Sequence, residues 1–253
     1  MTRPRFAIYT VPGAGLADAA GAALCQRAEQ WLGRSASGQP VAPGVAAGWT
    51  RTELDAITAS ARRYSFHATL KAPFRLAEGR TPEELDAALA QFAASHADAL
   101  IPRLSLACLS GFYALVPGAE AAGLQALADE VVTCFDAFRA PATGPEIARR
   151  DPASLTSRQR ELLEAWGYPY VLDEFRFHLT LTDRIPRERR PAVERTLRSW
   201  FAASLGITVP VGALALFTED EPGAPFALHA VYPLQPASSS SRADAPAESE
   251  GTR

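Results

Sequence analysis

The sequence predicts an α+β protein built from two similar lobes, each with an antiparallel sheet flanked by helices. Short stretches that alternate apolar and polar residues, as strands do, are separated by longer stretches with the period of a helix. The order strand, helix, strand, strand recurs at similar distances in the two halves of the chain. A strand in which threonine follows histidine at the second position also occurs once in each half. We therefore expect two pseudo-symmetric lobes.

We expect these lobes to form a single domain over residues 1–234. The first lobe covers about 1–118 and the second about 119–234, with room for elements to be exchanged between them. Residues 235–253 contain no periodic apolar positions. Such a segment has no apolar burial to offset the entropy of ordering, so we expect a disordered tail there.

The first half carries clear start and turn signals. Thr81 is placed to cap a helix, with Pro82 at its first position and Glu84 three residues after the cap. Residues 110–111, a Ser-Gly pair, join two alternating runs and predict a hairpin. The expected elements are strands at 5–11, 63–72, 103–109 and 112–118, helices at 16–33, 50–63 and 81–96, and a loop at 34–50.

The second half follows the same plan. Thr156 and Gln159 form a capping box, and Gly167 is a stop signal for the helix that follows them. The expected elements are helices at 121–139, 155–167 and 186–206, and strands at 174–183, 209–217 and 224–234.

Composition narrows the class of protein. Apolar residues make up 47% and charged residues 21%, as in a globular protein in water. The net charge of −3 gives no general attraction to nucleic acid or to a membrane surface, and no apolar run approaches the ~18 residues of a membrane helix. Three isolated cysteines suit a reducing compartment and show no metal-ligand spacing. We expect a cytoplasmic protein with no membrane partner, no metal and no cofactor, and a monomer.

The first histidine motif is "YSFHATLKAPF", residues 64–74. Because side chains of a strand alternate between its faces, His67, Thr69 and Lys71 are expected on one polar face. Lys71 is the only lysine of the chain. A compact ammonium in place of an arginine fork suggests a specific role for it at a site.

The second motif is "FRFHLTLTD", residues 175–183. The same alternation puts Arg176, His178, Thr180 and Thr182 together on the polar face. Each strand thus presents an imidazole, a hydroxyl and a positive charge. One imidazole can take a proton while the other gives one, threonine can bind phosphate oxygens, and a cation can stabilise the added negative charge. This set predicts cleavage of a phosphodiester without a metal.

The duplicated His-x-Thr motif resembles that of the two-histidine (2H) phosphoesterase superfamily. "RRYSFHATLKAPFRL" with "DEFRFHLTLT" is most similar to a bacterial branch associated with phosphonate-utilisation operons. The resemblance covers most of residues 5–234 and implies a bilobal fold with one motif per lobe, facing each other across a central cleft. It assigns catalysis to His67 and His178 and substrate binding to Thr69 and Thr180. Lys71 and Arg176 are assigned to the substrate by strand alternation alone.

The expected reaction is hydrolysis of a cyclic phosphodiester, of the 2',3'-cyclic nucleotide or ribose cyclic phosphate type, in phosphonate metabolism. One histidine activates water and the other protonates the leaving hydroxyl, in an order that the sequence leaves open. The partner is then a small phosphodiester or nucleotide. The alternatives are an RNA-end processing or 2',5'-RNA ligase-like enzyme, and a non-enzymatic nucleotide- or RNA-binding module.

Other polar residues have simpler expected roles. His96 ends a helix, and His229 is expected to be a strand histidine with a local partner. The pairs Arg62-Arg63 and Arg149-Arg150 are expected to be solvated, although Arg63 shares the parity of His67 and could face the same cleft.

Overall fold

The computed structural model describes residues 4–15 and 17–236. Most of the predicted tail, residues 237–253, therefore lies outside the described residues. Gln235, its first residue, is tied to the body: its amide donates to the His96 carbonyl at 2.8 Å, and its carbonyl accepts from the Asp98 amide at 2.7 Å. A shortened chain that ends at Pro236 therefore keeps these two bonds, whereas one that ends at Leu234 loses them.

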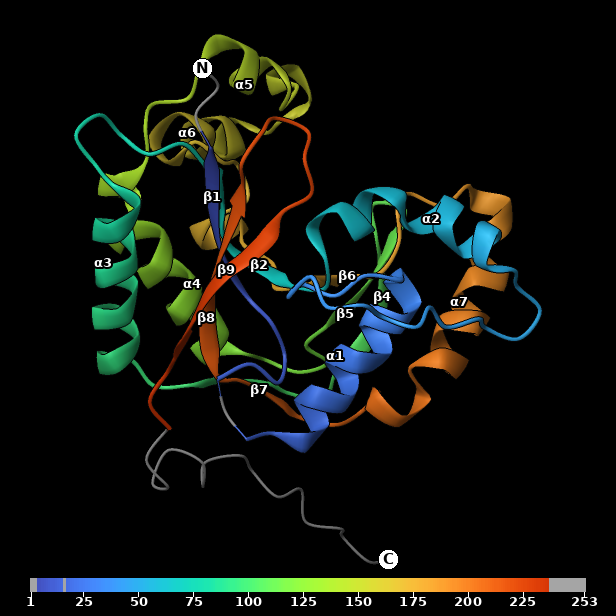
Figure 1. Cartoon of the computed structure of the whole chain (residues 1–253). Helices are drawn as coiled ribbons and strands as arrows, with labels where there is room; N and C mark the ends of the chain where they lie inside the picture. Colours follow the sequence, from blue (N-terminus) through green and yellow to red (C-terminus); the bar gives the residue numbers. More distant parts are fainter. Residues whose placement is uncertain (1–3, 16, 237–253) are drawn as a thin grey trace, which may run out of the picture.

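The larger sheet has four antiparallel strands in the order β2-β1-β8-β9. Helices α3 and α4 pack on it, α3 against β8 and β9 and α4 against β2 (Figure 1). The elements of this lobe are β1 (Arg5–Thr10), β2 (Ala68–Phe74), α3 (Pro82–Ser95), α4 (Ala122–Cys134), β8 (Ala213–Glu219) and β9 (Ala227–Pro233).

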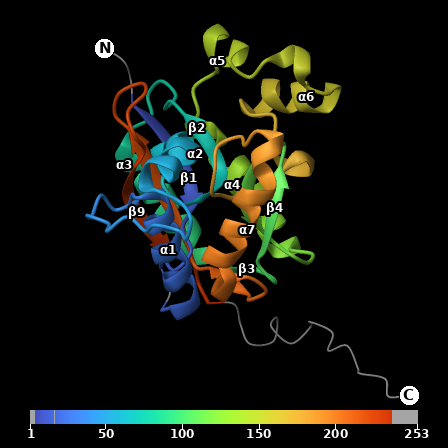
Figure 2. The same ribbon diagram turned by 90° about the vertical axis from the view of Figure 1, so that its right-hand side faces the viewer.

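The smaller sheet has the order β4-β5-β6 and lies beside helices α1, α2 and α7 (Figures 1 and 2). Its elements are α1 (Ala19–Leu32), α2 (Arg51–Tyr64), β4 (Ser105–Leu109), β5 (Phe112–Val116), β6 (Leu179–Thr180) and α7 (Arg190–Trp200). Trp31 connects α1 to α7 and to the end of β6: its ring contacts Trp200, and its indole N–H donates to the Leu181 carbonyl at 2.8 Å. A two-stranded sheet, β3 (Ala99–Ile101) with β7 (Val209–Val211), completes the strands described.

The predicted α+β class with antiparallel sheets flanked by helices is confirmed. The two lobes do not follow the two halves of the chain, however. Strand β8, from the second half, pairs with β1 of the first half on one edge and with β9 on the other. Likewise β5, of the hairpin β4-β5 in the first half, pairs with β6 of the second half. One main cluster of buried apolar side chains runs through both lobes.

The predicted helix signals are present in the structure. Capping boxes start α2 at Thr50, α3 at Thr81 and α6 (Ser157–Trp166) at Thr156, each with the third residue beyond the cap returning a bond. Gly33 and Gly167 end α1 and α6 in the left-handed conformation. The elements in regions without a predicted helix or strand are short: α5 (Gly144–Ala148), β3, and the 3₁₀ turns η2 (Pro152–Ser154) and η3 (Leu172–Glu174). The helices predicted at 121–139 and 186–206 are α4 and α7 with 3₁₀ turns at their ends: η1 (Asp136–Phe138), η4 (Arg187–Arg189) and η5 (Ala202–Ser204).

The strand predicted over 174–183 is reduced to the two residues of β6. The turn η3 ends at Glu174, and residues 175–178 between it and β6 belong to no strand ladder. Beyond Thr180 the pairing is irregular, because the amides of Leu181 and Thr182 both donate to the Tyr113 carbonyl. This change matters for the site, since strict alternation does not hold outside a ladder.

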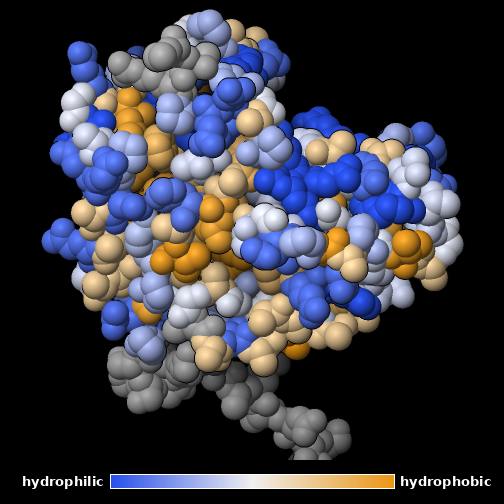
Figure 3. Space-filling view, in the orientation of Figure 1, coloured by the Kyte–Doolittle hydropathy of each residue, from blue (hydrophilic) through white to orange (hydrophobic). Residues whose placement is uncertain are grey.

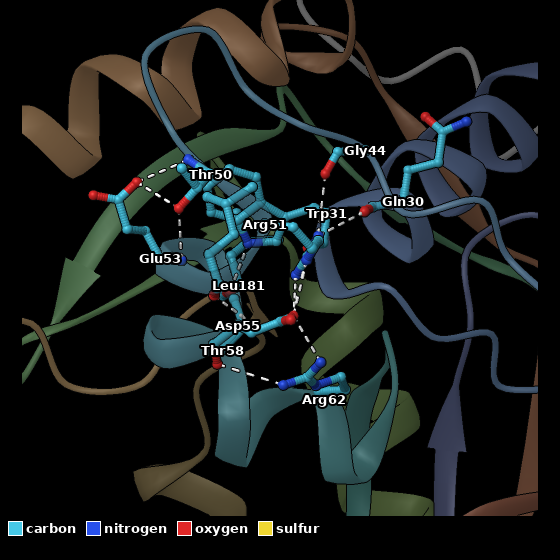
Figure 4. A network of polar contacts seen from close by, with 11 residues as sticks. Gln30, Trp31, Gly44, Thr50, Arg51, Glu53, Asp55, Thr58, Arg62 and Leu181 are labelled. Atoms are coloured by element: carbon cyan, nitrogen blue, oxygen red, sulfur yellow. Dashed lines mark hydrogen bonds and ion pairs between the residues drawn. The ribbon is translucent and has the colours of Figure 1, made fainter.

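Helix α2 leads into the first motif and is fixed at its start by Arg51 (Figure 4). The Arg51 guanidinium donates to the carbonyls of Gln30, Trp31 and Gly44, at 3.3, 2.9 and 3.2 Å. It also pairs with Asp55, which accepts in turn from the side chain of Arg62 at 2.7 Å. These bonds lock α2 to the end of α1 and to the loop at 34–50.

Candidate active site

A cavity of about 380 Å³ lies where β2 and β6 approach each other, and we call it the histidine cavity. It is bounded by parts of both lobes, so each lobe contributes one of the two motifs. The lining residues used below are Tyr9, Tyr64, His67, Thr69, Phe112 and Thr180. In the orientation of Figure 1, hydrophilic side chains gather over α2, next to this junction (Figure 3).

The ring of His67 is held from several sides. Its Nδ1 donates to the Ser65 carbonyl at 3.0 Å, and the Tyr9 ring stacks on it with centroids 3.8 Å apart. Because Nδ1 carries the proton in the neutral ring, Nε2 is left to accept, and the Thr69 hydroxyl lies 3.3 Å from it. Ser65 itself has a left-handed φ of 61°, an uncommon conformation for a residue with a side chain and one often found at functional sites.

This environment keeps His67 uncharged. Its pKa is lowered to about 4, chiefly by burial and to a smaller extent by the charge of His178. The hydrogen bond to Ser65 acts in the opposite direction and does not compensate. A neutral imidazole at neutral pH can accept a proton, as a general base must.

His178 is not among the residues that line the histidine cavity, but it contacts one that is. Its ring lies 5.8 Å from that of Phe112, which lines the cavity, and its Nδ1 donates to the Arg176 carbonyl at 2.7 Å. The two catalytic candidates are therefore held in the same way, each by the carbonyl of the residue two positions before it. In both rings Nε2 is the nitrogen left for chemistry.

The two threonines of the motifs line the histidine cavity. The hydroxyl of Thr180 has no hydrogen-bond partner within residues 4–15 and 17–236, so it can bind a ligand. Thr182 differs, because its buried hydroxyl accepts from the Tyr113 amide at 2.9 Å and donates to the Asp183 carbonyl at 2.8 Å. Its role is to shape the backbone at the end of β6.

Lys71 does not face the cavity, which corrects the expectation drawn from strand alternation. Tyr9 pairs with Thr69 and Ile8 with Lys71, so one residue of β1 opposes two of β2. This β-bulge shifts the alternation, and Ala72 lines the cavity in place of Lys71. Lys71 is only 4% exposed.

The ammonium of Lys71 has structural partners instead. It donates to the Val132 carbonyl in the last turn of α4 and to the Asp136 carboxylate, both at 3.1 Å. Arg139 also pairs with Asp136. Burial lowers the pKa of Lys71, and Asp136 works against that shift. Lys71 thus joins β2 to the carboxyl end of α4.

Arg176 is likewise not brought to the histidine cavity. Its side chain is exposed and lies outside the cavity lining. The reason is that residues 175–178 belong to no ladder, so the expected alternation does not apply to them. Its contribution to the site is the backbone carbonyl that orients His178.

Sequence reasoning missed the cations that do line the cavity: Arg5, Arg150 and Arg184. Arg5 is fixed by an ion pair with buried Glu219, which also pairs with Arg63. Arg184 directly follows the second motif, and that adjacency was the one available signal. Arg150 comes from the segment after α5, a region for which the sequence predicted no element.

The remaining histidines both have local partners, which was expected of His229 but not of His96. His96 lies 3.2 Å from Glu130, and His229 lies 3.5 Å from Asp86 on the exposed side of β9. No group of three His, Cys, Asp or Glu side chains suited to a metal occurs in the part of the chain that the structure describes. Within that part, no helix has the length and hydropathy needed to cross a membrane.

Two solved structures show partial likeness to the chain. The protein TT0787 of Thermus thermophilus is 19% identical, with 92% of this chain and 100% of that chain covered and a TM-score of 0.44. A crystal structure titled as a phosphoesterase is 14% identical, with 92% and 99% covered and a TM-score of 0.40. Both scores are too low to establish a common fold.

Sequence relatives are closer. Two curated proteins named Ribose 1,5-bisphosphate phosphokinase PhnN are similar to the chain. That of Janthinobacterium sp. (strain Marseille) is 39% identical over 227 residues, 88% of this chain and 49% of its own length. That of Laribacter hongkongensis (strain HLHK9) is 36% identical over 250 residues, 95% of this chain and 54% of its own. The chain spans about half the length of these relatives.

A family model described as "Protein of unknown function (DUF1045)" matches residues 69–227, which include Thr69 and the whole second motif. This match covers more than half of the chain, and the chain therefore belongs to the DUF1045 family.

Proposed function

We propose that this protein hydrolyses a cyclic phosphodiester without a metal, by general acid–base catalysis between His67 and His178. The observation that carries the proposal is their matched geometry. Each imidazole is oriented through Nδ1 by the carbonyl two residues before it, and each precedes a threonine that lines the same cavity.

His67 is proposed as the base. Its lowered pKa leaves Nε2 free to take a proton from water, whose oxygen then attacks phosphorus. As the bond from phosphorus to the ring oxygen breaks, Nε2–H of His178 gives its proton to that oxygen. The product is a phosphomonoester with a free hydroxyl, and the two histidines then exchange a proton through solvent. In this proposal Thr180 donates to a non-bridging oxygen, and Arg184 and Arg5 offset the added charge; all three line the histidine cavity.

The name of the curated relatives bears on the substrate. PhnN agrees with the phosphonate-linked resemblance of the motifs, and a ribose phosphate is the substrate class that the relatives' name suggests. We do not propose the kinase step for this chain. A nucleotide-binding P-loop needs a lysine beside the phosphates, and the only lysine here is buried against Asp136.

The test is turnover by variants of the two histidines. A panel of cyclic phosphodiesters, including ribose cyclic phosphates and 2',3'-cyclic nucleotides, identifies a working substrate. His67→Ala and His178→Ala should each lower kcat by roughly 10²–10⁴-fold. The matched control is His229→Ala, which removes an exposed histidine paired with Asp86 and should leave turnover unchanged. Near-normal turnover by either cavity variant, correctly folded, would contradict the paired mechanism.

A further inference from the structure

A second and larger cavity, of about 870 Å³, adjoins the histidine cavity, and we call it the arginine cavity. The two share part of their walls: Arg5, Tyr64, Pro73 and Arg150 line both. A molecule held at the two motifs can therefore extend into the arginine cavity without leaving the protein surface.

Positive charge dominates this wall. The protein as a whole has a net charge of −3, so a local excess of cations is not a general property of its surface. Glu146 is the one carboxylate that lines the arginine cavity within the described residues. The cations that line it are Arg5, Arg63, Arg75, Arg139, Arg149 and Arg150.

Four of these arginines are fixed by carboxylates. Glu219 pairs with both Arg5 and Arg63 from a position that is 1% exposed. Asp136 pairs with Arg139, and Glu146 with Arg75. Three carboxylates thus pair with four guanidinium groups. Their negative charges do not neutralise all four, so the wall of the cavity keeps a net positive charge.

Arg149 and Arg150 are the two that lack such a partner. Neither side chain forms an ion pair or hydrogen bond with any other residue in the described ranges. Their backbone is nevertheless held, because the two amides donate to the carbonyls of Pro145 and Ile147 at 3.2 and 2.9 Å. The Arg150 guanidinium lies 4.7 Å from the centroid of the Tyr168 ring, a stacked position that keeps its N–H groups available at the edge.

We propose that the arginine cavity binds a second phosphate of the substrate, a terminal phosphomonoester on the same molecule as the cyclic diester. A monoester phosphate carries about two charges at neutral pH and accepts the paired N–H bonds that an arginine fork donates. Arg150, common to both cavities, holds this phosphate together with Arg149. The inference rests on the proposed function and narrows it to phosphorylated cyclic phosphodiesters of small size.

The experiment compares two substrates that differ only in the second phosphate: a nucleoside 2',3'-cyclic phosphate with a 5'-hydroxyl, and the same compound with a 5'-phosphate. The wild type should prefer the phosphorylated compound in kcat/KM. In the double variant R149Q/R150Q this preference should fall by about 10–100-fold, as for the loss of charged hydrogen bonds. Arg195→Gln, which replaces an exposed arginine of α7 outside both cavities, is the matched control and should keep the preference.

Three results would overturn the inference. They are equal use of both compounds by the wild type, an equal loss on both compounds in R149Q/R150Q, and faster cleavage of an oligonucleotide ending in a cyclic phosphate. The last would mean that the arginines follow a polynucleotide backbone. Inorganic phosphate, added as a competitor, should raise KM for the 5'-phosphorylated compound alone, which separates a true subsite from general anion binding.

A binding measurement keeps the inference separate from the proposed function. Calorimetric titration with a nucleoside 5'-monophosphate and with the unphosphorylated nucleoside needs no turnover. Tighter binding of the monophosphate by the wild type, lost in R149Q/R150Q, would support the subsite even if neither cyclic compound were hydrolysed. Equal affinity of the wild type for the monophosphate and for the unphosphorylated nucleoside would refute the subsite.

Discussion

Replacing Lys71 with methionine should destabilise the protein and leave its catalytic efficiency intact. Methionine keeps most of the buried aliphatic volume and removes the ammonium. The Val132 carbonyl in the last turn of α4 then loses its donor, and Asp136 keeps only Arg139. Loss of a charged hydrogen bond to a buried group costs about 1.5–3 kcal/mol.

Loss of the ion pair with Asp136 adds to this cost, whereas the variant no longer has to bury a charged group, which reduces it. We expect the free energy of unfolding to fall by roughly 3 kcal/mol in total. For a chain of 253 residues this lowers Tm by about 6–12 °C. Scanning calorimetry measures the shift, and steady-state kinetics on a cyclic phosphodiester measures the efficiency per folded molecule. The control is Arg198→Met, which breaks an exposed pair with Glu194 on α7 and should cost less than about 1 kcal/mol.

The opposite pattern would refute this reasoning. A Lys71→Met variant with an unchanged Tm and a clearly lower kcat/KM would mean that Lys71 contacts the substrate, as strand alternation predicted. It would also mean that the bulge in β2 does not persist in solution.

Three further outcomes follow from the structure. Because His67 must be neutral to act as base and its pKa is lowered to about 4, the acidic limb of the kcat/KM profile should lie near pH 4; an acidic limb near 6.5 would show that burial does not control this group. Dialysis against a strong chelator should leave turnover unchanged, since the described residues hold no cluster of three metal-binding side chains; activity lost and then restored by zinc or manganese would contradict this. A chain ending at Pro236 keeps both Gln235 backbone bonds and should match the full chain in Tm and turnover, whereas a lower Tm would mean that residues 237–253 dock on the body.

Local signals in the sequence were enough to predict most of the helices. Capping pairs such as Thr81 with Glu84 act within one turn, so their physics is contained in a few neighbouring residues. The same is true of the hairpin at 110–111, where Ser110 and Gly111 adopt positive φ. The histidines and threonines of the motifs were also predicted to share a site. The structure brings three of the four to line one cavity, and His178 contacts Phe112, another residue of that lining.

The failures concern features decided by distant parts of the chain. The bulge that turns Lys71 away arises from the register between β1 and β2, which a single strand does not reveal. The arginines of the cavity wall come from β1, from the segment after α5 and from the residue after the second motif. The residues around Arg150 in the sequence do not distinguish it from an ordinary solvated arginine.

The central position of β1 has a consequence for the order in which the chain can fold. One edge of β1 pairs with β2, the next strand along the chain, and the other with β8, as in the bond from Arg5 to Glu219 across 214 residues. During synthesis the β1–β2 ribbon must therefore keep one edge unpaired until β8 has left the ribosome. Contacts of such long range slow folding, and an open edge can pair with other chains meanwhile. Amino-terminal fragments that end before β8 should accordingly aggregate rather than fold as a separate lobe.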